Sequence, residues 1–340
     1  MPDRMLAAVF KGHGELALEE RPVPTVRLPD DVLLEVEAAG VCGTDLHICE
    51  DPPGHPATPG IILGHEYAGC VREVGKAVTL VAPGDRVVVA PALACGVCRY
   101  CRLGRPNQCE HGDAIGIFRD GGFARYSVVP ERGVFKISPN LPADEAVYAE
   151  LLSCVMGGTG KVRVQPGDSA VILGGGPAGL MFLLFLKAAG ASPVILVERG
   201  GFRGERAKHL GADLVINALQ EVVEPKVMEA TGLGADVVVD AVGTLFAEAM
   251  HLVAKGGKIL LFGMNARAAA TVCQNDLTRD EIAVLGTYVG VNTFPLVIKA
   301  LESGALKPSS LTTHRLPLDK IFDGFAAARA GEAIKVVLIP

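Results

Sequence analysis

Before residue 150 the chain alternates short apolar runs with glycine and proline turns. Clear examples are DVLLEVEAAGVC (31–42), AGCVREVG (68–75), GDRVVVAP (84–91) and FARYSVVP (123–130). Short runs rich in valine and bounded by Gly or Pro are typical of strands, and no long helical period interrupts them. The pattern predicts a β-rich, barrel-like domain over residues 1–149.

The pattern then changes. Residues 169–200 read SAVILGGGPAGLMFLLFLKAAGASPVILVERG, which is an apolar strand, a glycine turn, an apolar helix and a second apolar strand. Residues 206–217, 235–243 and 256–265 continue this alternation. Strands that alternate with helices predict a parallel sheet with crossover helices, so we expect an α/β domain over residues 150–289.

The last segment has a predicted helix at 294–306 and a mixed helix and strand pattern over 313–340. Two placements are open from the pattern alone. The segment either covers the parallel sheet or returns to the first domain.

Composition narrows the class of protein. The chain has 340 residues, 49% of them hydrophobic, and a net charge of -6 without a basic block, which predicts a two-domain soluble protein with no nucleic-acid surface. No apolar run reaches membrane-spanning length, and the N-terminus lacks a signal-peptide layout, so no membrane partner is expected. Nine cysteines in such a chain favour metal binding and reduced thiols, which predicts a cytoplasmic protein.

Four of the cysteines form a cluster. Cys95, Cys98, Cys101 and Cys109 lie within ALACGVCRYCRLGRPNQCEHG, residues 92–112. Four thiolates close a tetrahedral zinc shell and leave no position for water or substrate. The spacing therefore predicts a structural zinc site.

A second set of possible ligands is dispersed along the chain. AAGVCGTDLH contains Cys42, Thr44, Asp45 and His47, ILGHEYAG contains His65 and Glu66, and YAELLSC contains Glu150. One thiolate, one imidazole and one or two carboxylates would hold zinc with a position left for an oxygen ligand. Each residue also has an ordinary structural interpretation by itself, and the combination indicates the metal.

A dinucleotide site is predicted at AVILGGGPAGL. Gly174, Gly176 and Gly179 stand in G-x-G-x-x-G register between an apolar strand and an apolar helix. The glycines would allow a tight turn, approach of a pyrophosphate to the helix N-terminus, and close helix packing. Glu198, at the end of the second strand, would bind an adenosine ribose and repel a 2′-phosphate.

The choice between NAD and NADP depends on this edge of the domain. Arg199 and Arg203 could hold the extra phosphate of NADP. We give Glu198 the greater weight, and NAD is the expected cofactor.

The motifs together resemble one family. GVCGTDLH, GHEYAG, GDRVVV, the four-cysteine lobe, GGFARY, AELLSC, GGGPAG and IKVVLIP occur in the order found in zinc-dependent medium-chain dehydrogenases, the alcohol dehydrogenase superfamily. The resemblance covers essentially the whole chain. The Glu of GHE followed by the Glu of AELLSC looks like the polyol, sorbitol and threonine dehydrogenase branch. It implies a GroES-like catalytic domain (1–149 and 290–340) and a Rossmann domain (150–289).

The resemblance also implies a role for each residue. Cys42, His65 and Glu66 would bind a catalytic zinc, with Glu150 as a fourth ligand or as partner of a bound water. Thr44 would take the substrate proton, His47 would pass it towards solvent, and Asp45 would orient the His65 ring. The expected cofactor contacts are Cys154, Gly174, Gly176, Pro177, Ala178, Gly179, Glu198, Arg203, Val242 and Lys335, the last at the pyrophosphate.

The implied activity is oxidation of a polyol, sugar alcohol or sugar-alcohol phosphate to a ketone, with two zinc ions per chain and NAD. Threonine oxidation, or that of another secondary alcohol, shares all of these motifs and stays open. The non-enzymatic alternative is an NAD-binding protein that uses zinc only for structure and has no turnover, such as a redox sensor. A proton relay argues against it, because a sensor has no use for one. Family members are commonly homotetramers or dimers, so a homo-oligomer is expected.

Overall fold

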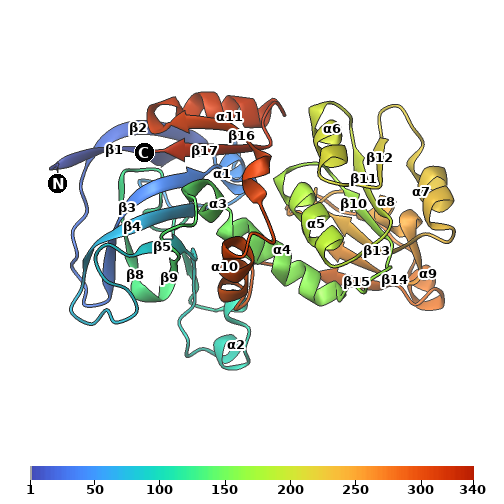
Figure 1. Cartoon of the computed structure of the whole chain (residues 1–340), viewed down its shortest axis with the longest axis horizontal. Coiled ribbons are helices and arrows are strands. Elements are labelled where there is room, and N and C mark those ends of the chain that lie inside the picture. The colour runs from blue at the N-terminus through green and yellow to red at the C-terminus, as the bar shows by residue number, and fades with distance from the viewer. Residues whose placement is uncertain (1) are drawn as a thin grey trace. The chain divides into compact units, whose positions relative to one another are not determined.

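The computed structural model describes residues 2–340, which divide into two compact units (Figure 1). Unit 1 runs to Ser153 and resumes at Val291, and unit 2 is Cys154–Gly290. The first division falls inside helix α4 (Ala149–Val162), whereas the sequence boundary lies at the start of that helix. A helix that continues across a division carries no turn signal there, so sequence pattern cannot mark the point.

Unit 1 contains a seven-stranded sheet in the order β16-β17-β3-β4-β5-β9, and β8 also pairs with β3. The strands of unit 1 are β1 (Arg4–Gly12), β2 (Glu15–Pro22), β3 (Asp31–Gly40), β4 (Glu66–Val74), β5 (Arg86–Val89), β6 (Ala92–Leu93), β7 (Asp113–Ala114), β8 (Tyr126–Pro130), β9 (Val134–Ile137), β16 (Thr312–Pro317) and β17 (Lys335–Ile339). Its short helices are α1 (Gly43–Ile48), α2 (Arg99–Arg102), α3 (Ala143–Ala146), α10 (Phe294–Glu302) and α11 (Ile321–Arg329), with 3-10 turns η1 (Pro106–Gln108), η2 (Glu131–Gly133), η3 (Pro308–Leu311) and η4 (Leu318–Lys320).

The C-terminal segment returns to unit 1. β17 pairs antiparallel with β3, where Val337 lies opposite Gly40, and β16 pairs parallel with β17. Of the two placements open from the sequence, the second is the one observed. The segment KVVLI is buried apart from its last residue, and all of it except Lys335 is apolar, as expected for a strand inside a sheet.

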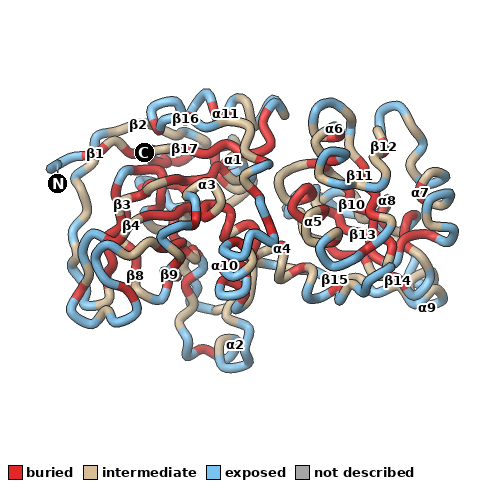
Figure 2. The backbone as a smooth tube through the Cα atoms, in the orientation of Figure 1, coloured by how far each residue is buried: buried red, intermediate tan, exposed pale blue. Residues whose placement is uncertain are grey.

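The core of unit 1 lies along its central strands (Figure 2). Eight of the ten β3 positions are buried, because β3 has neighbours on both sides. The four-cysteine segment instead forms a separate lobe around α2, away from the main sheet of the unit (Figure 1). Only β6, β7 and two short helical turns give this lobe regular structure, so its backbone has few hydrogen-bond ladders to hold it.

Unit 2 is a parallel six-stranded sheet in the order β12-β11-β10-β13-β14-β15. Its strands are β10 (Ala170–Leu173), β11 (Val194–Glu198), β12 (Leu214–Asn217), β13 (Ala235–Asp240), β14 (Val253–Leu261) and β15 (Ala283–Gly286). Its helices are α5 (Pro177–Ala188), α6 (Phe202–His209), α7 (Val223–Thr231), α8 (Phe246–Leu252) and α9 (Gln274–Arg279), in addition to its share of α4. Numbered within the unit, the strand order is 3-2-1-4-5-6, the order of dinucleotide-binding sheets. The predicted fold class, a GroES-like β-rich domain with a doubly wound Rossmann domain, is confirmed.

Across residues 2–340, none of the helices combines the length and the apolar character needed to cross a bilayer.

The third glycine of the G-x-G-x-x-G pattern is required by packing. A Cβ on Gly179 would lie 1.9 Å from the carbonyl oxygen of Gly174 and 3.4 Å from Cγ2 of Ile172. Helix α5 therefore sits directly against the end of β10, which directs the helix N-terminus to the carboxyl edge of the sheet.

We predict opposite effects of one substitution at two helical glycines of unit 2. Gly179→Ala should destabilise the unit by about 3 kcal/mol, because backbone must move to admit the methyl group. Gly160→Ala is the matched control, since a Cβ there meets nothing within 4 Å, and it should stabilise by about 0.5–1 kcal/mol. Thermal unfolding midpoints measure both, and equal midpoints for the two variants would contradict the packing argument.

Candidate active site and metal centres

Three strand ends bring the dispersed ligands together. Cys42 follows the end of β3, Glu66 begins β4 and Lys335 begins β17. Because β4 and β17 both run antiparallel to β3, their first residues lie beside the last residues of β3, and Glu66 is paired with Gly40. Residues almost 300 positions apart in sequence thus share one corner of unit 1.

The corner contains a three-residue ligand set. One ligand atom each from Cys42, His65 and Glu66 lies within 4.8 Å of the other two. His65 and Glu66 are buried, and Oε1 of Glu66 has no hydrogen-bond partner in the described part of the chain. A thiolate, an imidazole and a carboxylate with one position left over match the ligand set of a catalytic zinc, and a cation would supply the missing partner of Oε1. The residues therefore fit zinc.

Asp45 holds two of these ligands. Its Oδ2 accepts a hydrogen bond from the backbone N–H of Cys42 at 2.8 Å, and its Oδ1 lies 3.4 Å from Nδ1 of His65. Neither of these two atoms has a hydrogen-bond partner in the described part of the chain, so the contact is electrostatic, and it would orient the ring if Nε2 of His65 binds a metal. Burial lowers the pKa of His65, but Asp45 and Cys42 outweigh it and raise that pKa well above the ordinary value.

The side chain of Lys335 is buried inside unit 1 and contacts Glu66. Its ammonium is buried, bonds Oε2 of Glu66, and lies 5.8 Å from the centre of the Tyr148 ring. Burial lowers the pKa of Lys335, whereas the charges of Glu66 and Cys42 raise it, with a net rise. A Cβ on Gly40 would lie 2.5 Å from Oε2 of Glu66 and 2.8 Å from Cε of Lys335, so glycine makes room for this pair. The predicted contact of Lys335 with a pyrophosphate stays a prediction, and it would compete with Glu66.

The expected proton relay lies on helix α1. The hydroxyl of Thr44 is 3.7 Å from the sulfur of Cys42, and His47 is three residues further along the same helix face. His47 is exposed to solvent, and its Nδ1 lies 2.8 Å from Oε1 of Glu50. Glu150, in the first turn of α4, is not part of the group within 4.8 Å, so its role as ligand or water partner stays a prediction.

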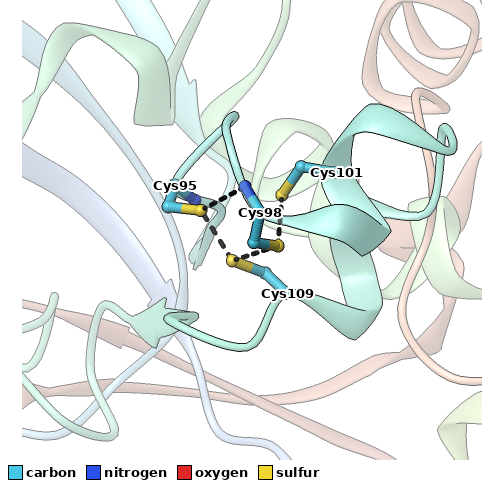
Figure 3. A group of neighbouring side chains, drawn as sticks. All are labelled: Cys95, Cys98, Cys101 and Cys109. Atoms are coloured by element: carbon cyan, nitrogen blue, oxygen red, sulfur yellow. Dashed lines mark hydrogen bonds between the residues drawn. The ribbon is translucent and has the colours of Figure 1, made fainter.

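The four clustered cysteines point at one another (Figure 3). The sulfur of Cys98 lies 3.5 Å from that of Cys101 and 3.9 Å from that of Cys109, and all four sulfurs are within 4.8 Å of one another. Sulfurs bound tetrahedrally to one zinc lie about 3.8 Å apart, so the cluster fits a closed zinc shell. The amides of Cys95 and Cys98 donate to the sulfurs of Cys109 and Cys95.

The charge state of the cluster also favours a cation. Backbone amides of Cys101 and Glu110 lower the pKa of Cys98 to about 6, whereas desolvation and the neighbouring Cys98 raise the pKa of Cys101 to about 12. Four thiolates cannot be held together at neutral pH without a compensating charge, and a divalent ion supplies it.

The glycine loop of unit 2 lies where the strand order reverses. Gly174 follows β10 and Val242 follows β13, and a Cβ on Gly174 would lie 2.6 Å from Cγ2 of Val242. Gly176 is the N-cap of α5, with Pro177 as the first helical residue, and a Cβ on Gly176 would meet no atom within 4 Å. Packing within the chain therefore does not require glycine at position 176. The space that Gly176 leaves at the N-terminus of α5 fits a pyrophosphate.

Glu198 ends β11 and turns towards the same loop. Its Oε2 accepts a hydrogen bond from the N–H of Gly175 at 2.5 Å, and its Oε1 accepts one from the N–H of Arg199 at 2.7 Å. A Cβ on Gly175 would lie 3.4 Å from Cβ of Arg203, so Arg203 borders the glycine loop as Glu198 does. Cys154 lies in α4 at the start of unit 2, and its expected contact with the nicotinamide stays a prediction.

Sequence reasoning missed Asp240. This residue ends β13, is buried, and accepts hydrogen bonds from the N–H groups of Val242, Gly243 and Leu245 at 2.8 to 2.9 Å. It therefore shapes the loop that presents Val242 beside Gly174. The only sequence signal was a carboxylate directly after the apolar run of β13.

Comparison with known proteins agrees with both units. Residues 28–139 match the family model of the alcohol dehydrogenase GroES-like domain, and residues 177–303 match that of the zinc-binding dehydrogenases. The chain is 34% identical to the erythritol/L-threitol dehydrogenase of Mycolicibacterium smegmatis, with 100% of this chain and 99% of the relative covered. It is 35% identical to an L-threonine 3-dehydrogenase of Pyrococcus horikoshii, again with 100% and 99% covered. A solved structure of a proposed zinc-binding dehydrogenase from Sinorhizobium meliloti, bound to NADP, superposes with a TM-score of 0.94 at 31% identity over 100% of both chains.

The buried pair of Lys335 and Glu66 generates a prediction. Lys335→Met should lower the unfolding free energy by about 3–5 kcal/mol, because it leaves Glu66 buried without its counter-charge. The exposed pair of Lys11 and Glu19 offers the control, and Lys11→Met should leave the thermal midpoint almost unchanged.

A double variant tests the cause of that loss. Adding Glu66→Gln to Lys335→Met should recover part of the lost stability, because the buried charge is then gone. Thermal unfolding of the wild type, Lys335→Met, Glu66→Gln and the double variant measures the coupling, and a Lys335→Met protein as stable as the wild type would overturn the assignment.

Proposed function

The chain belongs to the zinc-dependent alcohol dehydrogenase family and is an oxidoreductase acting on CH–OH groups, and from that premise we propose that it oxidises a secondary hydroxyl of a polyol or sugar alcohol to a ketone with NAD. The observation that carries the proposal is the ligand set of Cys42, His65 and Glu66, with the Thr44 hydroxyl 3.7 Å from the Cys42 sulfur. A structural zinc shell has no use for a neighbouring hydroxyl, whereas oxidation of an alcohol needs a group that accepts its proton, and the Thr44 hydroxyl can relay it.

Zinc held by Cys42, His65 and Glu66 would supply a Lewis acid that makes the substrate hydroxyl more acidic. NAD would accept the hydride. Asp45 keeps the His65 ring oriented through Nδ1, and Thr44 takes the substrate proton for transfer along α1 towards His47. His47 is exposed, so it can release that proton to water.

Charge explains why these groups tolerate burial. With Cys42 ionised as a ligand, the corner holds three negative groups, Cys42, Asp45 and Glu66, against the single ammonium of Lys335. A divalent cation balances the remaining two charges. Without it, the corner would keep uncompensated charge at low dielectric.

For the cofactor we propose NAD, because both oxygens of Glu198 lie at the edge of the glycine loop where a 2′-phosphate would meet them. NADP is the specific alternative, supported by the nearby Arg203 and by the NADP in the Sinorhizobium meliloti structure. Two zinc ions per chain, a cytoplasmic location consistent with reduced thiolate ligands, and a homo-oligomer complete the proposal.

Threonine oxidation is the second candidate activity, because the Pyrococcus horikoshii relative is as similar to this chain as the polyol relative is. We predict that a screen of sugar alcohols, their phosphates, diols and L-threonine finds the highest kcat/KM with a polyol and NAD. The screen is run with NAD and with NADP, on protein of measured zinc content. The highest kcat/KM with L-threonine would replace the proposed polyol by threonine as the substrate. A strong NADP preference would contradict the role of Glu198.

Two cysteine variants separate the two metal centres. Cys42→Ala should lower turnover by at least about 100-fold and leave NAD binding almost unchanged, because the ligand set loses its thiolate. Cys98→Ser should instead lower the thermal midpoint by at least about 5 °C, because the lobe loses its zinc.

The exposed Cys273→Ala is the matched control for both variants. Zinc content per chain, calorimetry with NAD and steady-state rates provide the readouts. Wild-type turnover in Cys42→Ala would refute the catalytic metal, and a folded, heat-stable Cys98→Ser protein without activity would refute a purely structural role for the lobe.

A further inference from the structure

Glu50 has no role in the site as described so far, yet it contacts the end of the relay. Its Oε1 lies 2.8 Å from Nδ1 of His47, and it stands two residues beyond the last residue of α1. Both side chains are partly exposed, 47% for His47 and 41% for Glu50. An exposed ion pair of this kind adds little stability, so stability does not explain the contact.

The surrounding backbone holds the pair in place. The N–H of Gly54 donates to the carbonyl oxygen of His47 at 2.9 Å, which folds the chain after Glu50 back onto the helix end. A Cβ on Gly54 would lie 2.8 Å from Oε2 of Glu50 and 3.3 Å from Cβ of His47. The carboxylate therefore sits between the helix end and the returning chain, against Gly54, where a side chain at position 54 would have to displace it.

This contact determines which nitrogen of His47 carries the proton. A carboxylate only accepts hydrogen bonds, so Nδ1 of His47 must donate, and the neutral ring keeps its lone pair on Nε2. His55, on the same returning segment, also lies near His47, and burial lowers its pKa. Glu50 is thus the charged partner of the His47 ring, with Asp45 engaged by Cys42 and His65.

We propose that Glu50 is a positioning residue of the proton relay, which keeps His47 in the Nδ1–H form so that Nε2 accepts the proton coming from Thr44. The ring then becomes an imidazolium paired with the Glu50 carboxylate. It returns to neutral by losing the Nε2 proton to water or to a buffer base, so one proton leaves for each alcohol oxidised. A carboxylate that fixes the tautomer of a catalytic imidazole acts by the same principle in hydrolytic triads. The inference rests on the proposed function.

The tautomer is tested without turnover. Nitrogen-15 spectra of the imidazole rings, with His47 assigned by comparison with His47→Asn, should show the proton of neutral His47 on Nδ1 in the wild type. Glu50→Gln should give a mixture of tautomers, because an amide can donate or accept. A wild-type proton on Nε2, or identical spectra for wild type and Glu50→Gln, would overturn the inference whatever the activity.

Steady-state kinetics test whether Glu50 assists proton release during turnover. Glu50→Gln should lower kcat on the order of tenfold in dilute buffer and leave both KM values unchanged, and Glu50→Asp should recover most of the loss. A high concentration of imidazole buffer should restore kcat, because it removes the proton directly. The double variant Glu50→Gln/His47→Asn should be no slower than His47→Asn alone.

Glu19→Gln is the matched control, the same substitution at an exposed paired carboxylate of β2 outside the site, and it should keep the wild-type rate. A Glu50→Gln loss that buffer does not relieve, or an added loss in the double variant, would mean that Glu50 acts structurally. Absence of turnover with every alcohol in the wild type would instead refute the proposed function, and the nitrogen spectra would still decide the role of Glu50.

Discussion

The contact between Glu66 and Lys335 is the interaction on which the candidate catalytic corner depends. Burying a carboxylate is costly unless a counter-charge accompanies it, and Lys335 supplies one to Oε2. Oε1 is left without a hydrogen-bond partner in the described chain, and one oxygen of this carboxylate lies within 4.8 Å of ligand atoms of Cys42 and His65. The ammonium thus makes the burial of Glu66 possible and leaves one oxygen for a cation.

This interaction depends on the return of the chain to unit 1 after the Rossmann sheet is complete. β17 delivers Lys335, and its pairing with β3 places that residue over Gly40 and next to the start of β4. The last strand is therefore both an element of the β-sheet and the source of a charge that the site needs. The lobe with the four cysteines has the opposite character, because all its ligands come from one short segment and close on themselves.

Local patterns were sufficient for much of the prediction. The fold class followed from the change between strand and strand–helix periodicity, and the family followed from motifs that the comparisons bear out. The four clustered cysteines lie within fifteen positions, so nearness in sequence implied nearness in space. By contrast, Asp240, Glu50 and the pairing of Lys335 with Glu66 carry no distinctive motif. Their roles arise from hydrogen bonds and close approaches that form only when strands or loops meet.

The sequence by itself thus determined the layered architecture, the thiolate cluster and the glycine loop, because each depends on periodicity or on spacing within one segment. The return of the C-terminal strand to unit 1 was open from the pattern, was implied by the family resemblance, and is observed in the pairing of β17 with β3. Only the tertiary structure decided that Lys335 bonds Glu66 and that the Glu50 carboxylate lies beside His47 and against Gly54. These facts depend on the pairing of distant strands and on the space left around single side chains. Neither quantity is written in the order of the residues, since both are properties of the packed chain.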